Sequence, residues 1–94
     1  MRVNVKFFGL LRLDLGRWGD ELTVSDGSTV WEVLEALVEK NGEVFRNYIY
    51  DEHGQVREHI TFQINGKNVK TLMGFDTALK EGDSLLILPP FGGG

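Results

Sequence analysis

The sequence contains no cysteine, which excludes disulfides, thiolate nucleophiles, iron–sulfur clusters and cysteine zinc sites. It also contains no cluster of positive charge, because no Lys or Arg is followed by another and the formal net charge is −4. Nucleic-acid-binding proteins usually carry a basic stripe, so no nucleic-acid partner is expected. No apolar stretch approaches the roughly 20 residues of a membrane span, so we expect no membrane partner.

The 94 residues are enough for one domain, with 41% hydrophobic and 26% charged residues, as in an ordinary globular chain. A domain of this size buries about two-thirds of the surface of its unfolded chain. Met1 leads directly into a strand-like pattern, with no hydrophobic core of a signal peptide before it. We therefore expect a cytoplasmic protein with one modest core.

The first quarter of the chain predicts two strands joined by a loop. Apolar and polar residues alternate from Arg2 to Phe7, which is the pattern of a half-buried strand, and Phe8 then places an apolar side chain on the outward face. Gly9–Gly19 is predicted to be a loop, in which Trp18 covers the edge of the core. Glu21–Ser25 is predicted to be a second strand that pairs with the first as a hairpin.

A helix is predicted over Thr29–Lys40. Apolar residues recur there at helical spacing and form one stripe that would face the core: Val30, Val33, Leu34, Leu37 and Val38. Thr29 followed by Glu32 matches a capping box, which satisfies backbone donors in the first turn. Asn41-Gly42 supplies a stop signal directly after the stripe.

The second half of the chain predicts a mixture of short elements. Glu43–Glu58 indicates a short second helix or helical turn, followed by a turn. Apolar and polar residues alternate over Ile60–Asn65, which predicts a strand, and Asn65-Gly66 predicts a two-residue hairpin turn before a short return strand over Lys67–Lys70. Leu72–Leu79 is predicted to be a covering loop with about one helical turn.

Leu85–Leu88 is a continuous apolar run, which predicts a central strand covered on both faces. Pro89 and Pro90 end it, because proline cannot donate to a ladder. The order of elements indicates an α+β fold with one main helix packed on one face of a mixed sheet of about five strands. With the first and last strands as parallel central neighbours, this is the β-grasp, or ubiquitin-like, arrangement over residues 1–88, followed by a flexible glycine-rich tail over residues 89–94.

This tail is the most informative segment. Two prolines make a stiff exit, and three glycines make a flexible, narrow end. Fully extended, the six residues reach about 20 Å, and the glycines, which have no Cβ atom, can pass through a tunnel that would reject any side chain. A terminal carboxyl is ionised at neutral pH and is a poor electrophile, so an external, ATP-using partner would have to convert the Gly94 carboxylate into an acyl-adenylate. The activated carbonyl would then accept either sulfur or an amine. On the tail alone, a frayed chain end is an equally good interpretation, and the exit directly from the last central strand through two prolines favours a functional tail.

No other pattern in the sequence points to catalysis or to a bound cofactor. His53 and His59 have a spacing that matches no recognised metal site, and both are expected on the solvated surface. No Ser/His/Asp arrangement, Walker-type loop or paired-carboxylate motif is present. We expect no metal, no bound cofactor and no catalysis by the chain alone.

Three segments resemble the MoaD/ThiS family of ubiquitin-like sulfur carriers, and above all its branch of molybdopterin synthase small subunits. Val5–Arg12 is similar to the opening of that branch, a strand that ends in two aromatics before an Arg-containing loop. Phe75–Asp83 matches its F-D-x-x-L-x-x-G-D segment, and Pro89–Gly94 is similar to its P-P-V-x-G-G terminus. The similarity runs in order over nearly the whole chain.

The resemblance implies a sulfur carrier. An adenylating, ubiquitin-activating-like enzyme would use ATP to activate Gly94, and a sulfur donor protein would supply the sulfur of a thiocarboxylate. The large subunit of molybdopterin synthase would then take this sulfur for the biosynthesis of molybdenum or tungsten cofactor. The resemblance also implies that Gly92 and Gly93 thread the partner's channel. The residues that would dock on partners are Phe8, Leu72, Leu88, Pro89, Pro90 and Phe91, with the first three gathered beside the tail.

Two other functions fit the same sequence. A ubiquitin-like modifier, attached to lysines of other proteins through Gly94, needs the same fold and the same tail, and the sequence does not separate it from a sulfur carrier. A pure interaction domain with an inert tail would tolerate the replacement of Gly93 and Gly94 by alanine.

Overall fold

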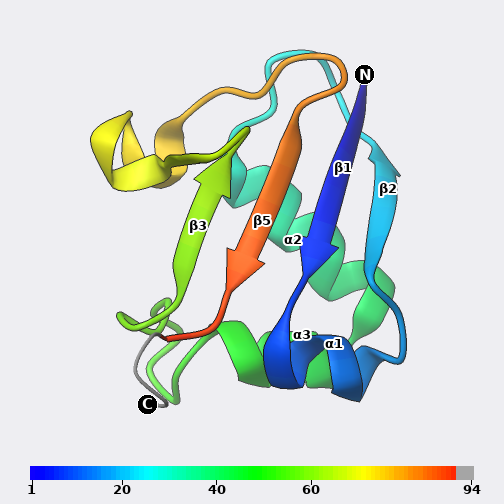
Figure 1. Ribbon diagram of the computed structural model, residues 1–94, viewed down its shortest axis with the longest axis vertical. Helices are drawn as coiled ribbons and strands as arrows, with labels where there is room; N and C mark the ends of the chain where they lie inside the picture. The colour runs from blue at the N-terminus through cyan, green and yellow to red at the C-terminus, as the bar shows by residue number, and fades with distance from the viewer. Residues whose placement is uncertain (91–94) are drawn as a thin grey trace.

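The computed structural model describes residues 1–90, and Phe91, Gly92, Gly93 and Gly94 lie outside the described residues. Strands and helices follow one another as shown in Figure 1. They are β1 (Arg2–Phe7), α1 (Gly9–Leu15), β2 (Gly19–Thr23), α2 (Val30–Asn41), α3 (Glu43–Ile49), β3 (Thr61–Ile64), β4 (Lys67–Asn68) and β5 (Ser84–Leu88), with 3-10 turns η1 (Val69–Thr71) and η2 (Gly74–Asp76) between the last two strands.

The five strands form one mixed sheet in the order β2-β1-β5-β3-β4. The first and last strands, β1 and β5, are parallel and adjacent, and the other neighbouring pairs are antiparallel. The helices lie on one side of the sheet, and α1 and α3 sit at the end where β1 and β5 finish (Figure 1). This is the ubiquitin-like β-grasp fold, so the predicted α+β class, strand number and parallel central pair are confirmed.

The core lies between the sheet and α2. Its helical side is the predicted apolar stripe, of which Val30, Val33, Leu34 and Leu37 are fully buried. The capping box is also present: the Thr29 hydroxyl accepts from the backbone N–H of Glu32 (3.4 Å), and the Glu32 carboxylate accepts from the backbone N–H of Thr29 (3.0 Å). Burial of the stripe and satisfaction of the first turn together hold α2 against the sheet.

The prediction of a loop over Gly9–Gly19 is wrong, because its first half forms α1. Leu11 is fully buried and Leu15, one turn later, packs against the core. Gly16 ends the helix in the left-handed conformation (φ 74°). Trp18 does not cover the core, since 69% of it is exposed and the Arg12 guanidinium carbon stacks 4.0 Å from its ring centroid.

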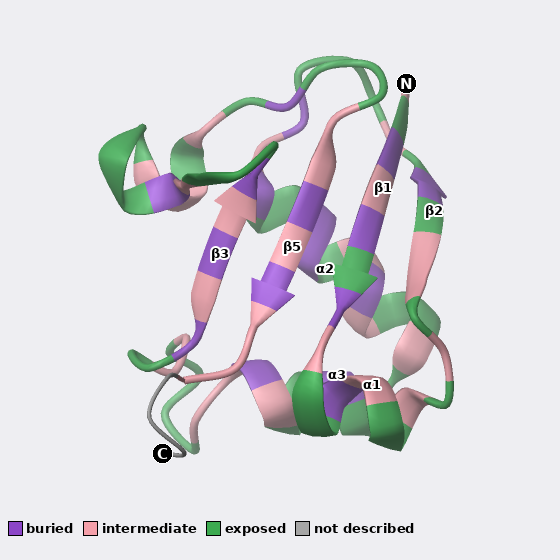
Figure 2. Cartoon of the chain, in the orientation of Figure 1, coloured by how far each residue is buried: buried purple, intermediate pink, exposed green. Residues whose placement is uncertain are grey.

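Two strand predictions need correction. Leu85 and Ile87 are buried, but Leu86 and Leu88 are only half-buried, because the helices cover one face of the sheet and leave the other open (Figure 2). The return strand after the predicted Asn65-Gly66 turn contains only Lys67–Asn68, since Val69 turns into η1 to bury its side chain. The open face therefore retains apolar residues in its central strand.

The segment after α2 follows the prediction. A short second helix, α3, buries Phe45 and Ile49. The turn that follows is organised by the Asp51 carboxylate, which accepts from the backbone N–H groups of His53 (2.8 Å) and Gln55 (3.0 Å) and whose pKa these bonds lower. Among the described residues, no helix is long and apolar enough to cross a membrane.

A buried ion pair ties the outer strand to the helices. The side chain of Asp20, on β2, is 4% exposed and faces the helical layer. It accepts from Arg17 (2.8 Å) and from the amide of Asn41 (3.3 Å), and the Lys40 ammonium lies 3.2 Å away. Burial acts to raise the pKa of Asp20, but these donors outweigh it, so the pKa lies below its ordinary value.

Replacement of Asp20 by asparagine should lower the free energy of unfolding at neutral pH by about 1 to 3 kcal/mol, because it removes a charged acceptor from three donors. Since the pKa of Asp20 is lower in the folded than in the unfolded chain, its contribution is present above the ordinary Asp pKa and is lost as pH falls through the folded value. Urea unfolding of the wild type and the variant, at neutral pH and at about pH 3, measures this difference in the free energy of unfolding.

Glu21→Gln, at the exposed neighbouring position, is the matched control for the loss of one carboxylate. The gap in stability between the wild type and Asp20→Asn should shrink in acid, and a gap that stays constant with pH would contradict the role of the charge.

Candidate functional site

The candidate site is the place where the chain leaves the sheet, which we call the tail root and define as Leu88, Pro89 and Pro90. All three are half-buried. β5 is the central strand and runs parallel to β1, so the tail root emerges beside the end of β1 (Figure 1). The predicted site residues Phe91, Gly92, Gly93 and Gly94 continue from it and lie outside the described residues.

Gly9 makes room for the tail root. It follows β1 directly and has a φ of +62°, a conformation that L side chains rarely adopt. A Cβ atom at this position would lie 3.2 Å from both Cβ and Cγ of Pro89. No local sequence pattern predicts this contact, and the only signal for it is the Phe8-Gly9 step at the end of an apolar strand.

Apolar side chains gather on the open face of the sheet next to the tail root. Lys6 pairs with Leu86 and Phe7 with Ile87, so the next residues, Phe8 and Leu88, lie side by side. We call Phe8, Leu86 and Leu88 the sheet patch; all three are half-buried, and Lys6 adds a cation beside them. Apolar side chains gathered on an open sheet face are one feature of surfaces that contact other proteins.

Leu72 is not part of this patch, so its expected place beside the tail is wrong. Thr61 pairs with Leu88 at one end of β3, whereas Leu72 follows the hairpin at the other end of that strand. In Figure 1 the yellow turn next to Leu72 lies at the opposite end of the sheet from the exit of β5. Leu72 is 40% exposed there, because η1 ends just before it.

A groove of about 560 Å³ lies on the other side of the tail root, and we call it the tail-root groove. Gly9, Pro89 and Pro90 form one wall. The remaining lining residues come from α1, α3 and the segment before β3: Leu10, Asn47, Tyr48, Arg57, His59 and Ile60. Burial, and secondarily the charge of Asp14, raise the pKa of Tyr48, so its hydroxyl is protonated at neutral pH.

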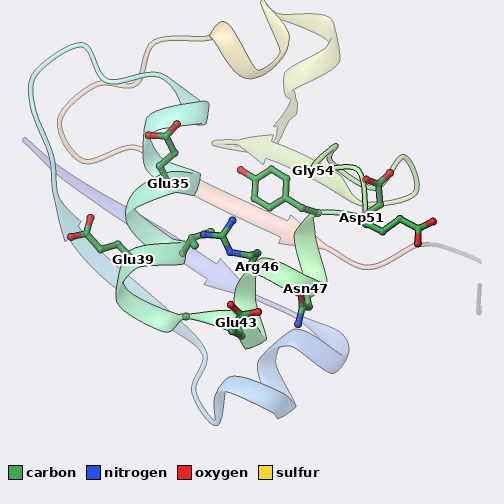
Figure 3. Close-up of a pocket in the computed structure, with 11 residues that line it drawn as sticks. Glu35, Glu39, Glu43, Arg46, Asn47, Asp51 and Gly54 are labelled. Carbon is green, nitrogen blue, oxygen red and sulfur yellow. The ribbon is translucent and has the colours of Figure 1, made fainter.

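A second groove, of about 780 Å³, runs along α2 and α3 and has acidic walls (Figure 3). Glu35 and Glu39 line it from α2, and Glu43 and Arg46 from α3. It shares only Asn47 with the tail-root groove. The described residues contain no group of three or more His, Asp or Glu that could hold a metal, and His53 and His59 are exposed as predicted.

The geometry defines a class of protein: a small β-grasp domain whose central strand ends next to an apolar patch. The family model described as the ThiS family matches residues 5–94 of the chain. The chain belongs to this family of ubiquitin-like sulfur carriers, as its sequence motifs indicate.

Individual relatives agree with this assignment. The chain is 33% identical to small archaeal modifier protein 3 of Haloferax volcanii over the full length of both proteins. Its structure is similar to that of small archaeal modifier protein 1 from Methanosarcina acetivorans, with a TM-score of 0.83 and 34% identity over 99% of this chain and 96% of the other. A putative molybdopterin converting factor subunit 1 from Pyrococcus furiosus is also similar, with a TM-score of 0.74 and 26% identity over 96% and 98% of the two chains.

Gly9→Ala should shift the tail root and destabilise the fold, because it adds a contact with Pro89 to a left-handed backbone penalty of about 1 to 2 kcal/mol. The measurements are urea unfolding and the carbon chemical shifts of Pro89. Gly16→Ala is the matched control, since Gly16 also has a positive φ (+74°) but no atom lies within 4 Å of its added Cβ. Equal shifts of Pro89 in both variants would refute the role of Gly9.

Proposed function

We propose that the carboxylate of Gly94, as the C-terminal residue of the mature chain, is activated by an adenylating, ubiquitin-activating-like enzyme. The observation that carries this proposal is the tail root: a central strand leaves the fold through two prolines beside an apolar sheet patch. Gly92 and Gly93 then thread the partner's channel, and Phe8, Leu88, Pro89, Pro90 and Phe91 contact the partner.

The chemistry of a carboxylate explains why a partner is needed. With a pKa of about 3.3 to 3.7, the α-carboxyl is ionised at neutral pH and does not accept nucleophiles. Attack of its oxygen on the α-phosphorus of ATP releases pyrophosphate and gives an acyl-adenylate. A nucleophile then attacks the carbonyl carbon and AMP leaves, so ATP is used by the partner and is not a resident cofactor of this chain.

With sulfur as the nucleophile the product is a thiocarboxylate, and the chain acts as a sulfur carrier. We propose that a sulfur donor protein supplies this sulfur and that the large subunit of molybdopterin synthase receives it, for molybdenum or tungsten cofactor synthesis in the cytoplasm. Membership of the ThiS family and the similarity to the Pyrococcus furiosus molybdopterin converting factor support this role.

With a lysine amine as the nucleophile the product is an isopeptide bond, and the chain acts as a protein modifier. This second candidate is favoured by the structural similarity to small archaeal modifier protein 1, with TM-scores of 0.83 to 0.87, against 0.74 for the molybdopterin converting factor. Both roles require the same adenylation step, so one chain can serve both.

Intact mass spectrometry distinguishes the products. The full chain, incubated with ATP, the adenylating enzyme of its organism and a sulfur donor, should gain one sulfur in place of one oxygen at Gly94. Lysine-linked adducts in a cell extract, lost when Gly94 is deleted, would instead support modification. A plain carboxylate and no adducts in every condition would leave only the interaction domain with an inert tail.

Leu88→Asp should weaken binding to the adenylating enzyme by about tenfold or more, because it places a charge in the sheet patch. Leu72→Asp, at the opposite end of the sheet, should change the dissociation constant by less than about twofold. Isothermal titration calorimetry measures both, and a thermal melt of each variant controls for folding. A larger loss with Leu72→Asp than with Leu88→Asp would contradict the proposed surface.

A further inference from the structure

The tail root has two faces, and the sheet patch accounts for only one of them. Pro89 and Pro90 also form a wall of the tail-root groove, which lies on the helical side. Any partner that encloses the residues after Pro90 must therefore pass close to this groove as well. The two surfaces are continuous through the tail root itself.

Leu10 lines the groove with an apolar side chain that is not buried in the core. It is 67% exposed, whereas the next residue of α1, Leu11, is fully buried in the core. Across the groove, Ile60 is buried and Tyr48 is half-buried, so their apolar surface forms the floor. A hollow with one exposed leucine at its lip is shaped to receive an apolar side chain.

The charge of the groove is opposite to that of the chain. Within residues 1–90, Arg57 and His59 are its only charged or titratable lining groups apart from the Tyr48 hydroxyl, and no carboxylate is among the lining residues, although the whole chain carries a net charge of −4. The Asp14 carboxylate, whose charge acts on Tyr48, lines a separate hollow. Glu58, between them in sequence, lines a different hollow. The acidic groove along α2 and α3 has five carboxylates and one arginine. A partner with a carboxylate would thus be attracted to the tail-root groove and repelled next to it.

The Arg57 side chain is held in position. Its Nε and Nη2 atoms donate to the backbone carbonyl of Asn47 at 3.3 Å and 3.2 Å, which anchors the guanidinium at the groove. An anchored guanidinium loses less conformational entropy when it binds a carboxylate than a freely rotating side chain does.

We propose that the tail-root groove is a second docking site, which takes an apolar side chain flanked by a carboxylate on the adenylating partner. The partner then grips the tail root from both sides, with the sheet patch on one face and the groove on the other. This inference rests on the proposed function, since it names a further contact of the same partner.

A pair of leucines on one helix provides the test. Leu10 and Leu13 belong to α1 and are exposed to similar extents (67% and 63%), but only Leu10 lines the groove. Leu10→Glu should weaken binding of the full chain to the adenylating enzyme by about tenfold or more, and Leu13→Glu by less than about twofold. The measurement is the dissociation constant by calorimetry, with thermal melts of both variants.

Two arginines test the charge. Arg57→Gln should weaken the same binding and reduce its dependence on salt between low and high ionic strength, whereas Arg46→Gln, in the acidic groove, should not. Equal effects of the two members of either pair would overturn the docking site. Tighter binding by Leu10→Glu would also overturn it, because that result would mean that the chain's own tail occupies the groove.

Adenylation of the wild-type chain shows whether a negative result counts against the proposed function or only against the second docking site. If the adenylating enzyme does not release pyrophosphate from ATP in the presence of the wild type, the proposed function fails and the groove loses its partner. If the wild type is adenylated but Leu10→Glu binds like Leu13→Glu, only the second docking site is refuted.

Discussion

The parallel pairing of β1 with β5 at the centre of the sheet is the constraint on which the rest of the site depends. It places Phe8 beside Leu88 on the open face and Gly9 against Pro89 at the exit. Because a parallel pair needs a long crossover between its strands, the helices and the remaining strands all lie between these two in the sequence. The fold thus brings Phe8 and Gly9, at the end of the first strand, to the point where the chain leaves the sheet.

The rest of the molecule keeps that point fixed and accessible. The apolar stripe of α2 and the Asp20 ion pair hold the helices to one face of the sheet, so the other face remains open for contacts. α1 and α3 close the end of the core next to the tail root and line the groove on its second side. A rigid support of this kind lowers the entropy cost of binding, because the surfaces around the tail root are already in place before a partner binds.

The strong periodic elements could be predicted from sequence, whereas the surfaces around the exit could not. The stripe and capping box of α2 and the alternation in β1 and β3 depend on local spacing and were predicted correctly. The sequence does not predict α1, because two of its four leucines (Leu10 and Leu13) point outward and two (Leu11 and Leu15) inward, so its apolar residues do not share one face. Leu72 was misplaced because local pattern does not reveal which end of β3 a residue will reach. The tail-root groove joins four separate segments, so no sequence pattern defines it.

If another protein converts the carboxylate of Gly94 into an acyl-adenylate, as we propose, ATP–pyrophosphate exchange will detect that step. The adenylating enzyme should exchange labelled pyrophosphate into ATP only when the chain is added, and a chain with one alanine appended after Gly94 should not support the exchange although it folds and binds. Exchange at the same rate with the extended chain, or no exchange with the wild type, would contradict the account.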